Sequence, residues 1–114
     1  MAQLPDQALV QVAQYFQALA EPTRLKILNE LRNGERNVGE LAQVCQCTLA
    51  NVSKHLSLLA KHGLVSRQGR GTSVYYGISD PNIYALCDLV CDNLLRQLDK
   101  QHEFANLIRQ AGGQ

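Results

Sequence analysis

The fold of this chain of 114 residues is decided by one stretch, Thr48-Leu49-Ala50-Asn51-Val52-Ser53-Lys54-His55-Leu56-Ser57-Leu58-Leu59. Its apolar residues recur with the period of an α-helix, so we predict a helix with one apolar and one polar face. Thr48 is suited to cap the start of this helix, and Gly63 is suited to end it. The face toward the core is expected to hold Leu49, Val52, Leu56 and Leu59, and the outer face Ala50, Lys54, Ser57 and Lys61.

The segments on either side complete a recognisable order of elements. A short helix over about residues 38–45 comes first, and Gln46-Cys47 forms the turn into the helix that Thr48 starts. Two strands follow at 64–68 and 73–78, with Gly69-Arg70-Gly71-Thr72 as the hairpin tip between them. This order is typical of a winged helix-turn-helix. We therefore predict a mainly α fold with a small β-hairpin.

The charge pattern agrees with a surface that contacts nucleic acid. The 39 residues from Leu41 to Ser79 contain no Asp or Glu, and they carry four basic side chains, Lys54, Lys61, Arg67 and Arg70. The net charge of the whole chain is only +1, so the basic residues are concentrated in this window. A contiguous basic stretch is the footprint expected of a protein that meets phosphates. It favours DNA binding over a winged helix used only for protein contacts.

Size and composition exclude several other classes of protein. A hydrophobic content of 46% fits one globular domain over residues 1–114. No apolar run approaches membrane-spanning length and no secretion signal is visible, so we expect a cytoplasmic protein with no membrane partner. The four cysteines, at 45, 47, 87 and 91, are therefore expected to be thiols. They form no Cys-x-x-Cys motif, and no nucleophile–base arrangement is suggested, so we do not expect an enzyme.

The helices at the two ends of the chain are expected to form a homodimer. Residues 5–19 have apolar side chains at helical spacing, and Pro22 is well placed to start the next helix. A last helix is predicted over about residues 80–98, with apolar residues on two of its faces, and residues 103–110 can continue as helix. A small domain can bury only one of these faces internally, so the other is expected to pack on a second copy. The alternative is that the segment after Lys100 folds back over this helix.

Three motifs resemble the ArsR/SmtB family of bacterial repressors over roughly residues 12–98. The first motif, Leu19-Ala20-Glu21-Pro22-Thr23-Arg24-Leu25-Lys26-Ile27-Leu28, is close to the family signature Leu-x-Asp-Pro-Thr-Arg-Leu-x-Ile-Leu. The others are Asn51-Val52-Ser53-Lys54-His55-Leu56-Ser57-Leu58-Leu59, and Gly63-Leu64-Val65 followed by Arg67-x-Gly-Arg-Gly-Thr-x-Val-Tyr-Tyr. The resemblance implies a homodimer built through its first and last helices, and a repressor released from DNA by a chemical signal.

The expected partner is a double-stranded DNA operator, read by about residues 37–78. Small outer side chains let the helix backbone sit deep in the major groove, and Ser and Lys can reach base edges or phosphates. Arg70 on the wing can reach the adjacent minor groove or backbone. Asn51 points sideways and can serve the fold instead. The predicted DNA contacts are Thr48, Ala50, Asn51, Ser53, Lys54, Ser57 and Arg70.

The zinc-type and arsenic-type ligand sets that the resemblance implies do not match this sequence. The family's zinc-type site uses an Asp and a His near the start of the last helix and two His further along. This chain has Asp80, but Asn82 stands in place of the first His. The arsenic-type site is a Cys-Val-Cys-Asp-Leu-Cys run, and this chain reads Asn37-Val38-Gly39-Glu40-Leu41-Ala42 there. We expect no resident cofactor.

Two cysteine pairs remain as candidate sensors. Cys45 and Cys47 flank the turn before the reading helix and are either packing residues or a redox switch, since a helix N-terminus can lower a thiol pKa. Cys87 and Cys91 are either packing residues or ligands for As(III) or a soft metal ion. We favour oxidation, or another thiol modification, of Cys45 and Cys47. A redox sensor needs two thiols, whereas a metal site needs three or four ligands.

Overall fold

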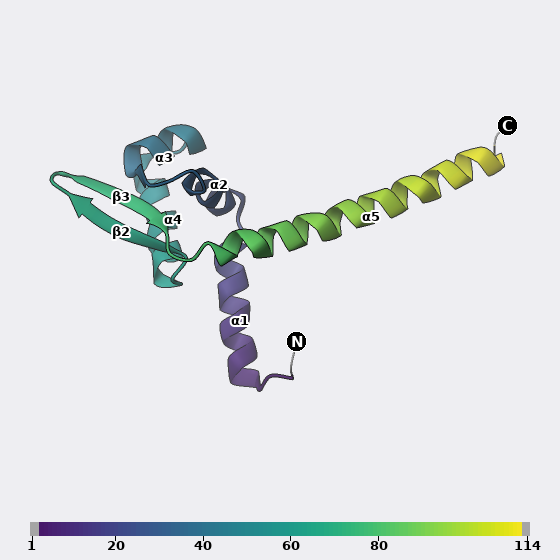
Figure 1. Cartoon of the computed structure of the whole chain (residues 1–114), viewed down its shortest axis with the longest axis horizontal. Coiled ribbons are helices and arrows are strands. Elements are labelled where there is room, and N and C mark those ends of the chain that lie inside the picture. The colour runs from purple at the N-terminus through teal and green to yellow at the C-terminus, as the bar shows by residue number, and fades with distance from the viewer. Residues whose placement is uncertain (1–2, 113–114) are drawn as a thin grey trace. The chain divides into compact units, whose positions relative to one another are not determined.

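The computed structural model describes residues 3–112 and forms two compact units, Met1–Asp80 and Pro81–Gln114, each of which is described by itself. The second unit contains one long helix, α5 (Asn82–Gly112). The mainly α fold with a small β-hairpin is confirmed. The first unit contains, in chain order, α1 (Asp6–Leu19), α2 (Pro22–Leu31), β1 (Arg36–Asn37), α3 (Val38–Cys45), α4 (Leu49–Lys61), β2 (Val65–Arg70) and β3 (Ser73–Ile78) (Figure 1).

Local signals in the sequence set where the helices begin. Glu21 caps α2, because its carboxylate accepts a hydrogen bond from the backbone N–H of Arg24 at 2.9 Å. Pro22 follows in the first turn of α2, where a missing N–H has no cost. Asn37 and Glu40 form a reciprocal capping box at the start of α3, with hydrogen bonds of 2.8 and 3.1 Å. These caps satisfy backbone donors that a helix leaves open at its N-terminus.

The core of the first unit lies between α2, α3 and α4, and the sheet packs against these helices. Val65 and Tyr76 contribute buried side chains from the sheet. The fully buried residues, each 0% exposed, are Ile27, Leu41, Val52, Leu56 and Leu59. Three of these belong to the predicted inward face of α4, which fixes the helix by its apolar side and leaves its polar side outward.

The sheet has three antiparallel strands in the order β1-β3-β2, one more than the hairpin predicted. The extra strand, β1, has only two residues, too few to show the alternation that identifies a strand in sequence. The hairpin tip is also shorter than predicted, because Gly69 pairs with Val74 and Arg70 with Ser73. Only Gly71-Thr72 remain in the turn, and Gly71 supplies the positive φ of 62°.

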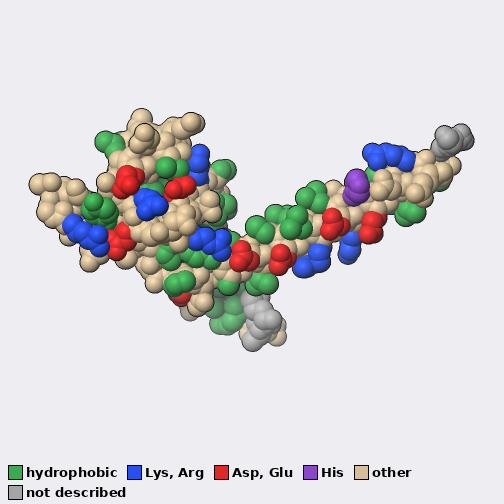
Figure 2. Space-filling model, turned by 45° about the horizontal axis from the view of Figure 1, so that its top comes forward, with side chains coloured by type: hydrophobic (Ala, Val, Ile, Leu, Met, Phe, Trp, Pro, Cys, Tyr) green, Lys and Arg blue, Asp and Glu red, His purple; other side chains and the backbone are tan. Residues whose placement is uncertain are grey.

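The last helix runs past the bound predicted near Leu98 to Gly112, and it includes the segment 103–110 that was expected to be able to continue it. No proline or glycine lies between Lys100 and Ala111, so nothing in the sequence stops the helix. The continuous helix shows that the fold-back alternative was wrong. No helix within residues 3–112 is long and apolar enough to cross a membrane. Hydrophobic side chains are exposed along α5 (Figure 2), namely Leu89, Val90, Leu94, Leu95, Leu98, Phe104, Leu107 and Ile108.

Candidate nucleic-acid interface

The outer face of α4 carries the predicted DNA contacts side by side. Val52, Leu56 and Leu59 hold the opposite face in the core with no exposed surface. This arrangement gives α4 the form of a reading helix, with short side chains and one lysine directed outward. The predicted contacts on α4, all exposed, are Ala50, Asn51, Ser53, Lys54 and Ser57.

Thr48 has a structural role at the start of α4. Its hydroxyl oxygen accepts a hydrogen bond from the backbone N–H of Asn51 at 3.1 Å, which makes Thr48 the N-cap. The Thr48 residue is nevertheless exposed, and the first turn of α4 contains no acidic residue. An uncompensated helix N-terminus carries a partial positive charge and favours phosphate. Thr48 therefore fixes the start of α4, where the partial positive charge of the helix is exposed.

Leu49 does not face the core, and this part of the prediction was wrong. Leu49 is the first residue of α4 and is 59% exposed. Side chains on a helix lean toward its N-terminus, so a residue in the first turn projects past the layer in which Val52 is buried. An apolar side chain beside the outer face can contact a thymine methyl group. Leu49 is thus a candidate contact that the periodicity assigned to the opposite face.

The wing residue Arg70 is held by an ion pair. Its Nη2 lies 2.7 Å from Oε2 of Glu35, and its guanidinium lies 5.1 Å from the ring centre of Tyr75. Glu35 precedes β1 and Arg70 ends β2, so the two side chains meet across β3, which lies between these strands. The charge of Arg70, which the sequence leaves free for DNA, is balanced by a carboxylate in this structure.

Gly77 makes room for this ion pair. A Cβ atom at Gly77 would lie 3.2 Å from Cγ of Glu35, closer than ordinary van der Waals contact. The Glu35 side chain therefore passes over a strand position that has no side chain. The absence of a side chain on β3 at this point is what allows Glu35 to approach Arg70.

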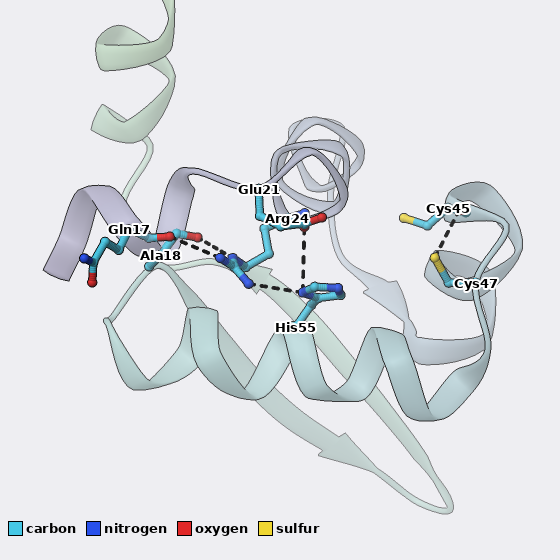
Figure 3. A network of polar contacts seen from close by, with 7 residues as sticks. All are labelled: Gln17, Ala18, Glu21, Arg24, Cys45, Cys47 and His55. Atoms are coloured by element: carbon cyan, nitrogen blue, oxygen red, sulfur yellow. Dashed lines mark hydrogen bonds and ion pairs between the residues drawn. The ribbon is translucent and has the colours of Figure 1, made fainter.

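The corner between α3 and α4 contains the first cysteine pair. Cys45 is buried and Cys47 is half-buried, and the Cys47 thiol donates a hydrogen bond to the Cys45 carbonyl oxygen at 3.3 Å (Figure 3). Burial, and then the neighbouring Cys47, raises the pKa of the Cys45 thiol. This is opposite to the lowered pKa expected at a helix N-terminus. Between the two cysteines, Gln46 has a positive φ of 54°, which an L-residue rarely adopts.

The second cysteine pair lies on α5, with Cys87 half-buried and Cys91 exposed. Within residues 3–112 of one chain, no three His, Cys, Asp or Glu side chains gather closely enough to hold a metal ion. Two thiols from one helix would leave a soft ion under-coordinated. A soft-metal site on α5 would thus need ligands from a second copy.

Sequence reasoning missed a polar network at the edge of α4. Arg24 of α2 contacts the backbone of Gln17 and Ala18 in α1, and also the ring of His55 in α4 (Figure 3). Glu21 lies beside His55, with a separation of 3.8 Å between Oε2 and Nδ1. The position of His55 in the predicted helix favoured DNA contact or solvation over metal binding, whereas its side chain is only 16% exposed and turns toward Arg24. The break at Ala20-Glu21-Pro22 indicated that Arg24 lies near the start of a new helix, but it gave no indication of a contact with His55.

Comparison with known proteins relates the chain to transcriptional regulators. A helix-turn-helix domain model matches residues 19–68. The regulator NmtR of Mycobacterium tuberculosis is 41% identical over 87 residues, which cover 76% of this chain and 72% of NmtR. A probable mercury resistance operon repressor of Streptomyces lividans is 39% identical over 71 residues, covering 62% of this chain and 57% of that protein. A Synechocystis SmtB homologue, a transcriptional repressor, is 36% identical over 89 residues, covering 78% and 67%. The expectation that the chain is not an enzyme is thereby confirmed.

Solved structures show the same fold. The homodimeric winged helix-turn-helix DNA-binding domain of Mb0332 from Mycobacterium bovis, a possible ArsR-family regulator, matches with a TM-score of 0.71 and 36% identity. The match covers 85% of this chain and 95% of that domain. Rv0081 of Mycobacterium tuberculosis matches with a TM-score of 0.75 and 31% identity, covering 87% of this chain and 98% of Rv0081.

Proposed function

The chain belongs to the ArsR/SmtB family of winged helix-turn-helix transcriptional repressors, and on that premise we propose that it is a homodimeric, cytoplasmic repressor released from its operator by modification of a cysteine thiol. The observation that carries the DNA-reading part is the outer face of α4. The outer face of α4 is exposed and carries no carboxylate, and Thr48 caps the start of the helix. Short side chains around Lys54 fit a major groove.

The proposed dimer is supported by apolar surface on the first and last helices. On α1, Leu9, Val10 and Phe16 are 42%, 56% and 50% exposed. A shallow groove of about 430 Å³ runs along α1, lined mostly by apolar side chains including Val12 and Phe16. Contiguous apolar surface of this kind marks a protein interface. A second copy of the chain is the occupant that the homodimeric relative supports.

The proposed signal acts at the corner before α4, with Cys47 as the first thiol to react. Cys47 is half-buried, whereas Cys45 is buried and the raised pKa of its thiol keeps it protonated. A peroxide would oxidise the Cys47 thiol to a sulfenic acid, and the peroxide would be reduced to water. Attack by the Cys45 thiol would then release a second water and form a disulfide. Because Gln46 already has a positive φ, closing this bond would distort the corner and the start of α4.

A second candidate signal is a soft metal ion or As(III) at Cys87 and Cys91. The observation that favours this candidate is the similarity of the chain to a probable mercury resistance operon repressor of Streptomyces lividans. Cys91 is exposed and can be reached by an ion from solution. Thiolates are the ligands that soft ions prefer, and a dimer could supply further thiols. This candidate predicts release by Hg²⁺ or As(III) that Cys87→Ser and Cys91→Ser abolish.

The DNA-reading part is tested with Lys54→Glu and with Lys100→Glu on α5 as the control that makes the same charge change elsewhere. The probe is a duplex that the wild-type protein selects from a random library. We expect Lys54→Glu to weaken binding by about 2–3 kcal/mol, since a carboxylate replaces a cation against phosphates or acceptor-rich base edges. Undiminished binding by a folded Lys54→Glu dimer would refute the assignment of α4 as the reading helix.

The thiol part is tested by treating the protein with peroxide and measuring binding to the same duplex. Cys47→Ser is expected to keep binding after peroxide, whereas the Cys87→Ser/Cys91→Ser double variant is expected to lose it as the wild type does. Mass spectrometry identifies the first oxidised residue, expected to be Cys47. Equal loss of binding in all variants, or loss in none, would exclude a cysteine switch at the corner.

A further inference from the structure

We propose that Arg24 is a positioning residue for DNA reading, which clamps His55 of α4 to the C-terminal turn of α1 and so sets the orientation of α4. The proposal rests on the proposed function, in which α4 reads the operator and α1 packs on a second copy. Through Arg24, the helix α1, which packs on the second copy in the proposed dimer, is connected to the reading helix α4. Figure 3 shows Arg24 between the α1 backbone and the His55 ring.

The first step is that α1 and the second half of α4 are separated by a pocket. The pocket has a volume of about 340 Å³, and its walls include Gln14 and Gln17 of α1 and Leu58 and Lys61 of α4. Within the first unit, α1 packs mainly on α2. Direct side-chain packing therefore does little to fix α4 against α1 here, and Arg24 lies in the wall of the same pocket.

The second step is the attachment of Arg24 to α1. Its Nε donates to the carbonyl oxygen of Ala18 at 2.6 Å, and its Nη2 donates to the carbonyl oxygen of Gln17 at 3.1 Å. The last carbonyl groups of a helix have no N–H partner in a following turn, so they accept from other donors. The Gln17 carbonyl also accepts from the backbone N–H of Ala20 at 3.2 Å. A cation at this end also complements the negative pole of the helix dipole. The guanidinium is thus fixed to the end of α1 by two bonds.

The third step is the attachment of Arg24 to α4. Its Nη1 lies 3.3 Å from Nδ1 of His55. A guanidinium only donates hydrogen bonds, so Nδ1 must accept and the proton of the neutral ring must lie on Nε2. His55 lies between Lys54, on the outer face, and Leu56, in the core. Holding the ring therefore restrains the rotation of α4 about its own axis, which decides which side chains face the groove.

The fourth step is the role of Glu21, which fixes the base of the clamp. Its carboxylate accepts from the backbone N–H of Arg24 at 2.9 Å, and this hydrogen bond is the main cause that lowers the pKa of Glu21. The same carboxylate lies 3.8 Å from Nδ1 of His55. Glu21 therefore fixes the backbone of Arg24 and lies beside the His55 ring, at the start of α2.

These contacts make the side-chain shape of Arg24 essential, because three of its N–H groups point at three separate acceptors. Lysine has the same charge but no planar fork, and glutamine has neither the charge nor the reach. Histidine can be replaced more conservatively, since the side-chain amide of asparagine places an acceptor near the Nδ1 position. The amide of glutamine reaches instead toward the Nε2 position. The pair His55→Asn and His55→Gln thus separates the acceptor from the rest of the ring.

The experiment measures the ratio of affinities for two duplexes, one selected by the wild-type protein from a random library and one with the same bases scrambled. Arg24→Gln and His55→Gln are expected to lower this ratio by about tenfold, with binding to the scrambled duplex nearly unchanged. His55→Asn is expected to stay within about twofold of the wild type. The double variant Arg24→Gln/His55→Gln should be no worse than either single variant, because both remove the same contact.

Light scattering and urea unfolding on every variant separate positioning from folding. If Arg24→Gln fails to fold, the His55 pair decides, because its ring lies at the edge of the core. Equal loss of affinity for both duplexes in Arg24→Gln would mean that the guanidinium binds phosphates, and the proposal would be wrong. It would also be wrong if His55→Asn and His55→Gln behaved alike. A wild-type protein that selects no duplex would instead refute the proposed function.

Discussion

Glu35 is expected to restrain Arg70, and its replacement by glutamine should release the wing for DNA. The ion pair is short, at 2.7 Å, but the two side chains are 53% and 40% exposed. Pairs as exposed as this contribute no more than about 1 kcal/mol to stability. A phosphate that takes Arg70 must displace the Glu35 carboxylate, so removing the carboxylate should tighten binding by up to about fivefold. The free energy of unfolding should change by less than about 1 kcal/mol.

Fluorescence anisotropy with a labelled duplex at fixed salt measures this effect. The matched background is Arg70→Gln, in which Glu35→Gln should have no further effect on affinity because the restrained cation is already absent. Gly77→Ala offers an independent route, since the added methyl group would crowd Cγ of Glu35 at 3.2 Å and push it from Arg70. Weaker DNA binding by Glu35→Gln would refute the reasoning. It would mean that the ion pair holds the wing in the form that DNA requires.

Three further predictions concern the frame of the reading helix. Leu56→Ala removes a side chain that is 0% exposed and should lower the free energy of unfolding, measured in urea, by about 2–5 kcal/mol. Leu49→Ala removes a side chain that is 59% exposed and should lower the free energy of unfolding by less than about 1 kcal/mol. Thr48→Ala loses the cap bond to Asn51 and should cost about 1 kcal/mol, seen as a lower thermal midpoint. Burial raises the pKa of the Cys45 thiol, so stability should be constant below about pH 8.5, the ordinary thiol pKa, and fall as the pH rises through the raised value. Cys45→Ala should remove this alkaline loss, and iodoacetamide should label Cys47 before Cys45.

The reading helix could be predicted from sequence because its determinants are local. The spacing of Val52, Leu56 and Leu59 defines the buried face, and Thr48 three residues before Asn51 defines the cap. Both signals lie within one element and need no knowledge of distant parts of the chain. The same reasoning failed at Leu49. Periodicity predicts which face of a helix a residue lies on, but it does not predict whether the core extends as far as the first turn of that helix.

The missed contacts join residues that are far apart in the chain. Arg24 and His55 are 31 positions apart, and β1 is recognised only by its pairing with β3. The ion pair between Glu35 and Arg70 depends on that pairing, because β1 brings the carboxylate to the edge of the sheet. No local propensity encodes such meetings, since each depends on how separate elements pack. The end of α5 was hard to place for a simpler reason, because residues 103–110 could continue the helix and no stop signal lies between Lys100 and Ala111.

The fold brings two acidic residues from outside the acid-free window close to side chains inside it. The window from Leu41 to Ser79 contains no carboxylate, yet Glu35 reaches Arg70 at one edge and Glu21 reaches His55 at the other. Each phosphate neutralised by a free cation adds to sequence-independent binding, which weakens steeply with salt. The carboxylate that pairs with Arg70 removes one free cation from this term, while Lys54 stays exposed on the outer face of α4. Contacts to base edges then make up a larger share of the binding energy, and such contacts distinguish one sequence from another.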